Sequence, residues 1–177
     1  VTLNAVTGVT FSNGAVVGIA NSALAGTSVS SVIVKFSGFT KDGEGKLIIA
    51  ATSANTLGDV VVDAGTLTIN GTANVNSITV NDAGTLGGSG TISGNVDIRG
   101  GTLSPGNSPG KQTINGDLNI YDDGVIGSKA VIQLGGTVAG TGYDQVAVDG
   151  AVNIVGTHSQ LNVVQDGTFI PSRGDVF

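Results

Sequence analysis

Asp63-Ala64-Gly65-Thr66-Leu67 returns 19 residues later as Asp82-Ala83-Gly84-Thr85-Leu86, and Gly101-Thr102-Leu103 repeats the last three letters once more. A second signature consists of Gly, any residue, an aliphatic residue, Asn or Asp, and then Val or Ile. It begins at four glycines, Gly71, Gly94, Gly116 and Gly150. Similar units that return about every 20 residues indicate a solenoid, in which each repeat stacks on the one before it.

Within each repeat the apolar residues alternate with polar ones, as in Leu67/Ile69 and Ile78/Val80, which is the pattern of a strand buried on one face. Pairs such as Asn-Gly and Gly-Gly between these runs supply the positive φ that tight corners need. We therefore predict an all-β chain folded as a right-handed parallel β-helix of about eight or nine coils. A β-sandwich fits less well, because its hairpins would not repeat one sequence in phase. The longer gap before Gly150 predicts either an extra coil or a lateral loop between Tyr121 and Gly142.

The composition excludes several classes of function. The chain has 177 residues, 11% of them charged, with a formal net charge of -6 and no cysteine, so neither disulfides nor thiolate metal sites are available. Seven Lys and Arg residues, widely spaced, argue against a nucleic-acid partner. The longest apolar runs are far shorter than a spanning helix needs, so we expect no direct membrane insertion of this chain.

Several motifs resemble the passenger domains of bacterial autotransporters, the type V secretion family. The stretch Gly84 to Val96 and the stretch Gly100 to Gly110, which contains Leu-Ser-Pro-Gly-Asn-Ser-Pro-Gly, are similar to the passenger repeat. Lys41 to Leu67 is similar to the autotransporter-associated β-strand repeat. Gly142 to Val146 and Pro171 to Phe177 resemble the closing coils that precede the outer-membrane barrel in that family.

The resemblance covers residues 41–177, and we interpret residues 1–40 as N-terminal coils or an irregular insert of the same domain. It implies a fragment of a longer passenger, secreted through a C-terminal outer-membrane barrel and displayed on the bacterial cell surface or released. Passengers of this family resemble stalks that carry adhesive or enzymatic parts, and the resemblance does not imply which of these the chain carries. Because the repeats are polar on the outside and contain no catalytic constellation, we expect a structural stalk and adhesin used in attachment and virulence, not an enzyme. The expected partner is a host-cell protein, a matrix protein or a neighbouring cell surface.

Arg173-Gly174-Asp175 is the candidate adhesion site, because it spells the tripeptide that integrins recognise and exposed loops often carry binding function. The family keeps Gly-Asp followed by an aromatic residue at this place for its turn. Two interpretations therefore stay open, an adhesive tripeptide or a turn in which the arginine is incidental.

Two patterns in the sequence are typical of catalytic residues. Gly106 to Gly110 matches Gly-x-Ser-x-Gly, but the residue after Ser108 is Pro109, which lacks the backbone N–H that an oxyanion hole needs. The adjacent pair Asp122-Asp123 motivates the alternative function, a polysaccharide-active β-helix enzyme of the lyase or glycoside hydrolase type. The single histidine, His158, is expected at a solvated corner, and we expect no metal ion or cofactor.

The ends of a solenoid expose unpaired strand edges and an open core, which favour association unless they are capped. We therefore expect that the chain can associate end to end with itself.

Overall fold

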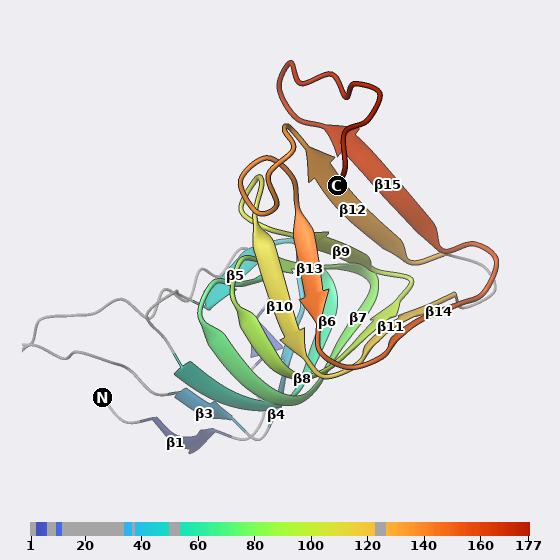
Figure 1. Cartoon of the computed structure of the whole chain (residues 1–177). Coiled ribbons are helices and arrows are strands. Elements are labelled where there is room, and N and C mark those ends of the chain that lie inside the picture. Colours follow the sequence, from blue (N-terminus) through green and yellow to red (C-terminus); the bar gives the residue numbers. More distant parts are fainter. Residues whose placement is uncertain (1–2, 7–9, 12–33, 37, 50–53, 123–126) are drawn as a thin grey trace, which may run out of the picture.

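The computed structural model describes residues 3–6, 10–11, 34–36, 38–49, 54–122 and 127–177 as an all-β chain, and none of them forms a helix that could cross a membrane (Figure 1). The strands pair in parallel and form a β-solenoid, which confirms the predicted fold class. In chain order the strands are β1 (Leu3–Val6), β2 (Thr10–Phe11), β3 (Val34–Phe36), β4 (Gly38–Lys41), β5 (Lys46–Ile49), β6 (Ala54–Ile69), β7 (Thr72–Gly88), β8 (Thr91–Arg99), β9 (Thr102–Pro105), β10 (Lys111–Asn115), β11 (Leu118–Tyr121), β12 (Lys129–Leu134), β13 (Gln145–Val148), β14 (Val152–Val155) and β15 (Gln160–Gln165).

Each turn of the solenoid contributes a strand segment to three faces. The first face contains β3, β10, β13 and the starts of β6, β7 and β8. The second face contains β4, β11, β14 and the later parts of these long strands. The third face contains β5, β9, β12, β15 and the ends of β6 and β7. Because β6 and β7 run through all three faces, they join the faces without interruption.

The sequence repeats lie in register on neighbouring turns. Ala64 pairs with Ala83 and Leu67 with Leu86, so the last four residues of the two copies of the repeated pentapeptide stack in register. The leucine continues through the third face as a buried ladder of four side chains, Leu47, Leu67, Leu86 and Leu103. In-register aliphatic side chains of this kind form one continuous core along the solenoid, as the sequence pattern predicted.

The predicted number of coils was wrong. The structure has about four turns rather than eight or nine: residues 54–69, 72–88, 91–105 and 111–134 each have a neighbouring turn on both sides. The strands β3, β4 and β5 pair with the first of these turns, and β13, β14 and β15 pair with the last. The prediction assumed that every turn has the same length of about 20 residues. The turns instead lengthen toward the C-terminus, and much of residues 1–40 lies outside the described residues.

The N-terminal part of the sheet is short. β1 and β2 pair in parallel with β3 and β4, so these segments belong to the same sheet as the later turns. The choice between coils and an irregular insert for the rest of residues 1–40 concerns positions outside the described residues.

The long gap before Gly150 contains a lateral loop and not an extra coil. β12 supplies the third face of its own turn, and residues 135–144 then leave the solenoid. The loop closes on itself where the Gly135 N–H donates to the Gly142 carbonyl at 2.7 Å. Leu134 and Tyr143 also form an antiparallel bridge at its base.

A buried lysine stabilises the first corner of the solenoid. Lys41 is 1% exposed, and its Nζ donates to the carbonyls of Asp42 at 2.9 Å, Gly43 at 2.6 Å and Ala64 at 2.9 Å. The first two carbonyls belong to its own corner and the third belongs to the next turn. The ammonium therefore ties two successive turns together.

Candidate functional site

The outside of the third face carries a groove of about 400 Å³. Successive turns contribute hydroxyl groups to it, from Thr66, Thr85 and Ser104, and Lys46 adds a cation. Gly87 forms part of the lining, and a Cβ there would lie 2.7 Å from the Ser104 carbonyl, so glycine is required for the next turn to pack against it. These groups can offer hydrogen bonds and one positive charge to a ligand.

The rim of the groove is a loop over residues 105–110 that two hydrogen bonds hold in place. The Gly106 N–H donates to the Gly88 carbonyl at 2.8 Å. The Gly110 N–H donates at 2.8 Å to the carboxylate of Asp144, which is 3% exposed. The other oxygen of Asp144 accepts from the Gln133 N–H at 2.9 Å, so one buried carboxylate joins the rim to the lateral loop.

The structure does not bring together the residues of the predicted Ser-His pattern. Ser108 lies in the groove rim, at the corner between the third and first faces. His158 lies at the corner between the second and third faces, on the turn between β14 and β15. The two corners lie at opposite ends of the third face, on different turns. Ser108 therefore has a structural place in the rim, in agreement with the absence of an N–H on Pro109.

His158 has a partner that the sequence did not indicate. Its Nδ1 lies 2.6 Å from Oδ2 of Asp122, and the same oxygen accepts from the backbone N–H groups of Thr157 at 2.8 Å and His158 at 2.7 Å. The Asp122 side chain is 3% exposed and the His158 side chain 53% exposed. Asp122 thus caps the equivalent corner of the next turn, while Asp123 lies outside the described residues. Tyr121 pairs with Val155, so Asp122 comes level with the start of the Gly-Thr-His turn, and alignment of these two corners is the signal that could have revealed the pair.

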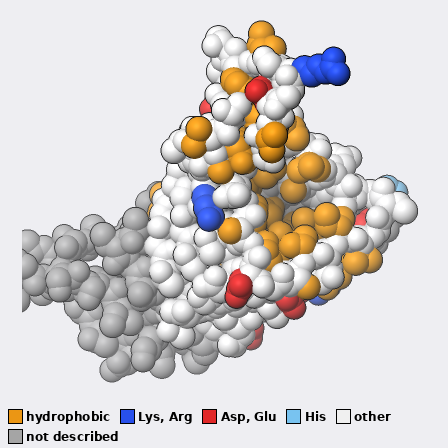
Figure 2. Space-filling model, viewed as in Figure 1, with side chains coloured by type: hydrophobic (Ala, Val, Ile, Leu, Met, Phe, Trp, Pro, Cys, Tyr) orange, Lys and Arg blue, Asp and Glu red, His pale blue; other side chains and the backbone are white. Residues whose placement is uncertain are grey.

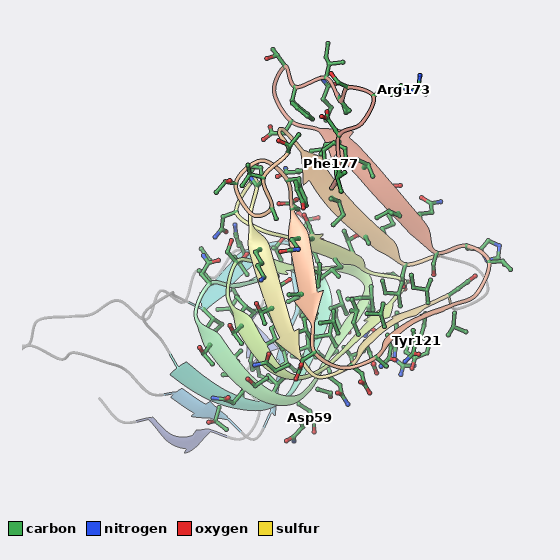
Figure 3. The ribbon with its side chains drawn as sticks, viewed as in Figure 1. Asp59, Tyr121, Arg173 and Phe177 are labelled. Atoms are coloured by element: carbon green, nitrogen blue, oxygen red, sulfur yellow. The ribbon has the colours of Figure 1, made fainter. Side chains whose placement is uncertain are left out.

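The candidate tripeptide forms a closed turn. The Ser172 N–H donates to Oδ2 of Asp175 at 2.7 Å, and the Asp175 N–H donates to the Ser172 carbonyl at 3.1 Å. Gly174 has a φ of 104°, which favours glycine at this position. Arg173 is exposed at the outer edge of the C-terminal loop, as Figure 3 shows. The turn explains the Gly and the Asp, and use of the tripeptide in adhesion stays a prediction.

Aromatic contacts attach the C-terminal segment to the lateral loop. The ring of Phe177 meets those of Tyr143 and Phe169 edge to face, with centroids 5.8 and 6.3 Å apart. Edge-to-face pairs of this geometry are favourable beyond the area that they bury. They fix the position from which Arg173 is presented.

The second face carries polar side chains that bond to one another across turns. The Ser77 hydroxyl donates to Asp59 at 3.0 Å, and Figure 3 shows Asp59 at the outside of this face. Farther along the solenoid the Asn119 amide donates to Asp97 at 2.8 Å, and Asn153 donates to Asn119 at 2.8 Å. The outer polar groups thus form ladders parallel to the core ladders.

No family model, curated protein or solved structure matches the chain in the comparisons. Within the part of the chain that the structure describes, no three or more His, Cys, Asp or Glu side chains gather in a way that could hold a metal ion.

Proposed function

We propose that the chain is a surface-exposed or secreted stalk and adhesin of the autotransporter passenger type. The observation that carries this proposal is the combination of a continuous aliphatic core with outer polar ladders that bond from turn to turn. Such a solenoid is extended and presents equivalent groups at regular spacing, which suits a protein that spans distance and makes repeated contacts. The motif resemblance over residues 41–177 supports the same proposal.

The groove on the third face is the surface that we assign to the contact with a host-cell protein, a matrix protein or a neighbouring cell surface. Its hydroxyl and amide groups offer directional hydrogen bonds to a polar partner surface, and Lys46 offers one positive charge. The tripeptide turn at Arg173 is a second place of contact within the same proposal.

Binding of the purified chain to immobilised matrix proteins and to host cells tests the proposal. Thr85→Arg fills the groove, whereas Thr79→Arg places the same side chain on the second face of the same strand and serves as the control. We expect saturable binding that Thr85→Arg reduces at least tenfold and Thr79→Arg leaves unchanged. Absence of saturable binding to any of these surfaces would contradict the adhesin function.

The tripeptide has its own control pair. Arg173→Ala removes its cation, and Lys129→Ala removes an exposed cation from β12. If the tripeptide contributes, only Arg173→Ala weakens binding to integrin-bearing cells.

The alternative function, a lyase or glycoside hydrolase, is motivated by the pair Asp122-Asp123, of which Asp122 lies among the described residues. One oxygen of that carboxylate already accepts two backbone N–H bonds and contacts the His158 ring. Incubation with acidic polysaccharides, followed by assays for reducing ends and unsaturated products, decides between the two functions. Product release that Asp122→Asn abolishes would establish the enzyme.

A further inference from the structure

The groove on the third face exists because one outward position has no side chain. Thr68, Gly87 and Ser104 occupy the same register position on three successive turns. A Cβ at Gly87 would lie 2.7 Å from the Ser104 carbonyl, so another residue there would force the backbone of the next turn to shift. This row therefore keeps a hollow at its middle, and Thr68, at the floor of the groove, is 3% exposed.

The groove is long and crosses the turns. Its lining begins at Lys46 on β5 and reaches Gln133 on β12, four register steps farther along the solenoid. At about 4.8 Å per step, this is a length of roughly 19 Å. Thr66 and Thr85 offer their hydroxyl groups one step apart. An extended polymer suits this shape better than a small compact molecule does.

Two observations argue against a peptide as that polymer. A peptide that lies on a sheet usually adds a strand to a free edge or places apolar side chains in pockets. The strand segments under the groove, which are the end of β6, the end of β7 and β9, are each paired on both sides. The described lining residues are mostly polar or glycine, and none of them is aromatic. A chain of sugar units fits better, because it carries hydroxyl groups along its whole length.

One cation is available to such a chain. Lys46 is the one charged residue among the described lining residues, it is exposed, and it forms no ion pair with a described residue. The exposed Glu44 lies two residues before it without an ion pair between them. The strands β5, β9, β12 and β15 of this face contain no Asp or Glu. Both oxygens of Asp144, at the rim, already accept backbone N–H bonds. Lys46 can therefore receive one carboxylate of a ligand.

The rest of the molecule limits how much negative charge the ligand can carry. The chain has a formal net charge of -6, and Figure 2 shows that charged side chains are few and scattered on the face that it presents. A densely sulfated or phosphorylated polymer would meet one cation in the groove and repulsion from the molecule as a whole. A polymer with isolated carboxylates avoids this repulsion.

We infer that the groove binds a segment of an acidic polysaccharide that carries isolated carboxylates, as uronic acids do, with one carboxylate at Lys46. A sugar unit of an extended chain has about the length of one register step, so about four units fill the groove. The inference rests on the proposed adhesin function and names the chemistry of the partner surface. The segment is held and not cleaved, because glycosidic cleavage ordinarily needs a pair of carboxyl groups and the described lining residues include no Asp or Glu.

Isothermal titration calorimetry of the whole chain tests the inference with a tetrasaccharide that alternates glucuronic acid with N-acetylglucosamine, and with the same tetrasaccharide after reduction of its carboxyl groups. Lys46→Gln removes the cation, and Lys111→Gln removes an exposed lysine of the first face as the control. We expect Lys46→Gln to weaken binding of the acidic form about fivefold and to leave the reduced form unchanged, because only the acidic form can pair with Lys46. Lys111→Gln should change neither.

A second pair of variants tests the hydroxyl groups. Thr85→Val removes one hydroxyl from the groove with little change of shape, and Thr79→Val does the same on the second face. We expect Thr85→Val to weaken both forms of the tetrasaccharide about threefold, since a neutral hydrogen bond is lost from each. Thr79→Val should weaken neither, and far-UV circular dichroism confirms that the four variants fold.

Three results would overturn the inference. One is that the folded chain does not bind the acidic tetrasaccharide at millimolar concentration. Another is that Lys46→Gln weakens the acidic and the reduced forms equally. The third is that a densely sulfated tetrasaccharide of the same length binds more tightly than the carboxylate form.

The adhesin function can fail separately from the inference. If cells bind the chain saturably and Thr85→Arg reduces that binding, while the tetrasaccharide does not bind, the inference fails and the adhesin function stands. If the tetrasaccharide binds as expected but no cell or matrix protein binds the chain saturably, the adhesin function fails and the assignment of the groove stands.

Discussion

Replacement of Lys41 by methionine tests how the first corner is held. Methionine has a similar length, so Lys41→Met keeps most of the packing and removes the ammonium from a side chain that is 1% exposed. The three carbonyls that now accept from Nζ lose their donor, and one of them, that of Ala64, belongs to the next turn. The variant therefore separates the contribution of the hydrogen bonds from that of the hydrophobic core.

Two opposing terms set the magnitude. Hydrogen bonds to a charged group contribute about 1.5–3 kcal/mol each, and Lys41 makes three. Burial of the ammonium costs several kcal/mol, which the bonds must offset. The difference gives an expected loss of roughly 2–4 kcal/mol in the free energy of unfolding.

Urea denaturation followed by far-UV circular dichroism measures this loss, with Lys46→Met as the control at an exposed lysine. We expect the control to change the free energy of unfolding by less than about 0.5 kcal/mol. If Lys41→Met costs less than about 1 kcal/mol, or no more than Lys46→Met, the ammonium does not hold the corner.

The same variant has a pH signature. Burial lowers the pKa of Lys41, against the opposing effect of the Asp42 carboxylate. Between this lowered pKa and the usual lysine value of about 10.4, the unfolded chain binds more protons at this position than the folded chain does. The stability of the unmodified chain should therefore rise with pH through that alkaline window relative to Lys41→Met. A constant difference between the two would contradict the lowered pKa.

Three further substitutions test the packing of the turns, each by urea denaturation. Gly94→Ala should lower the free energy of unfolding by more than about 2 kcal/mol, because the new Cβ would lie 2.2 Å from a carbonyl of the preceding turn and the φ of this residue is 146°. Gly167→Ala, with nothing within 4 Å of the new Cβ, should lower it by about 1 kcal/mol. Leu86→Ala should cost about 2–5 kcal/mol, while Leu161→Ala, in the same ladder but 68% exposed, should cost less than about 1 kcal/mol. Equal losses would contradict the difference in burial between the two leucines. Asp144→Asn should cost about 1–3 kcal/mol, because an amide can accept only one of its two backbone N–H bonds, and no loss would show that the rim is held by other contacts.

The fold class could be predicted because the structural repeat is also a repeat of the amino-acid sequence. In a parallel solenoid, equivalent positions of successive turns have the same surroundings. The same type of side chain is therefore favoured at both, as at Thr66 and Thr85 or at Leu67 and Leu86. The alternating pattern then tells which of them point inward. The number of turns could not be predicted in the same way, because loops such as residues 135–144 add length without adding a turn.

The polar contacts were harder to predict because they join residues far apart in the chain. Asp122 and His158 are 36 positions apart, and they meet only because their corners stack. Lys41 stands in a Lys-Asp-Gly turn, where a lysine is ordinarily solvated, yet carbonyls of two turns enclose it. Contacts of this kind depend on the register between turns, which only the paired strands determine.

The stacking of turns can be measured directly by distances between spin labels. Cysteines placed at outward positions of the second face label uniquely, since the chain has no cysteine of its own. Thr40 and Asn119 are four register steps apart and Thr40 and Asn153 five, through the series Thr40, Val61, Thr79, Asp97, Asn119 and Asn153. At about 4.8 Å per step the pulsed electron resonance distances should be about 19 and 24 Å, a difference of one turn. Equal distances, or a difference of about two steps, would contradict the in-register solenoid on which the proposed function depends.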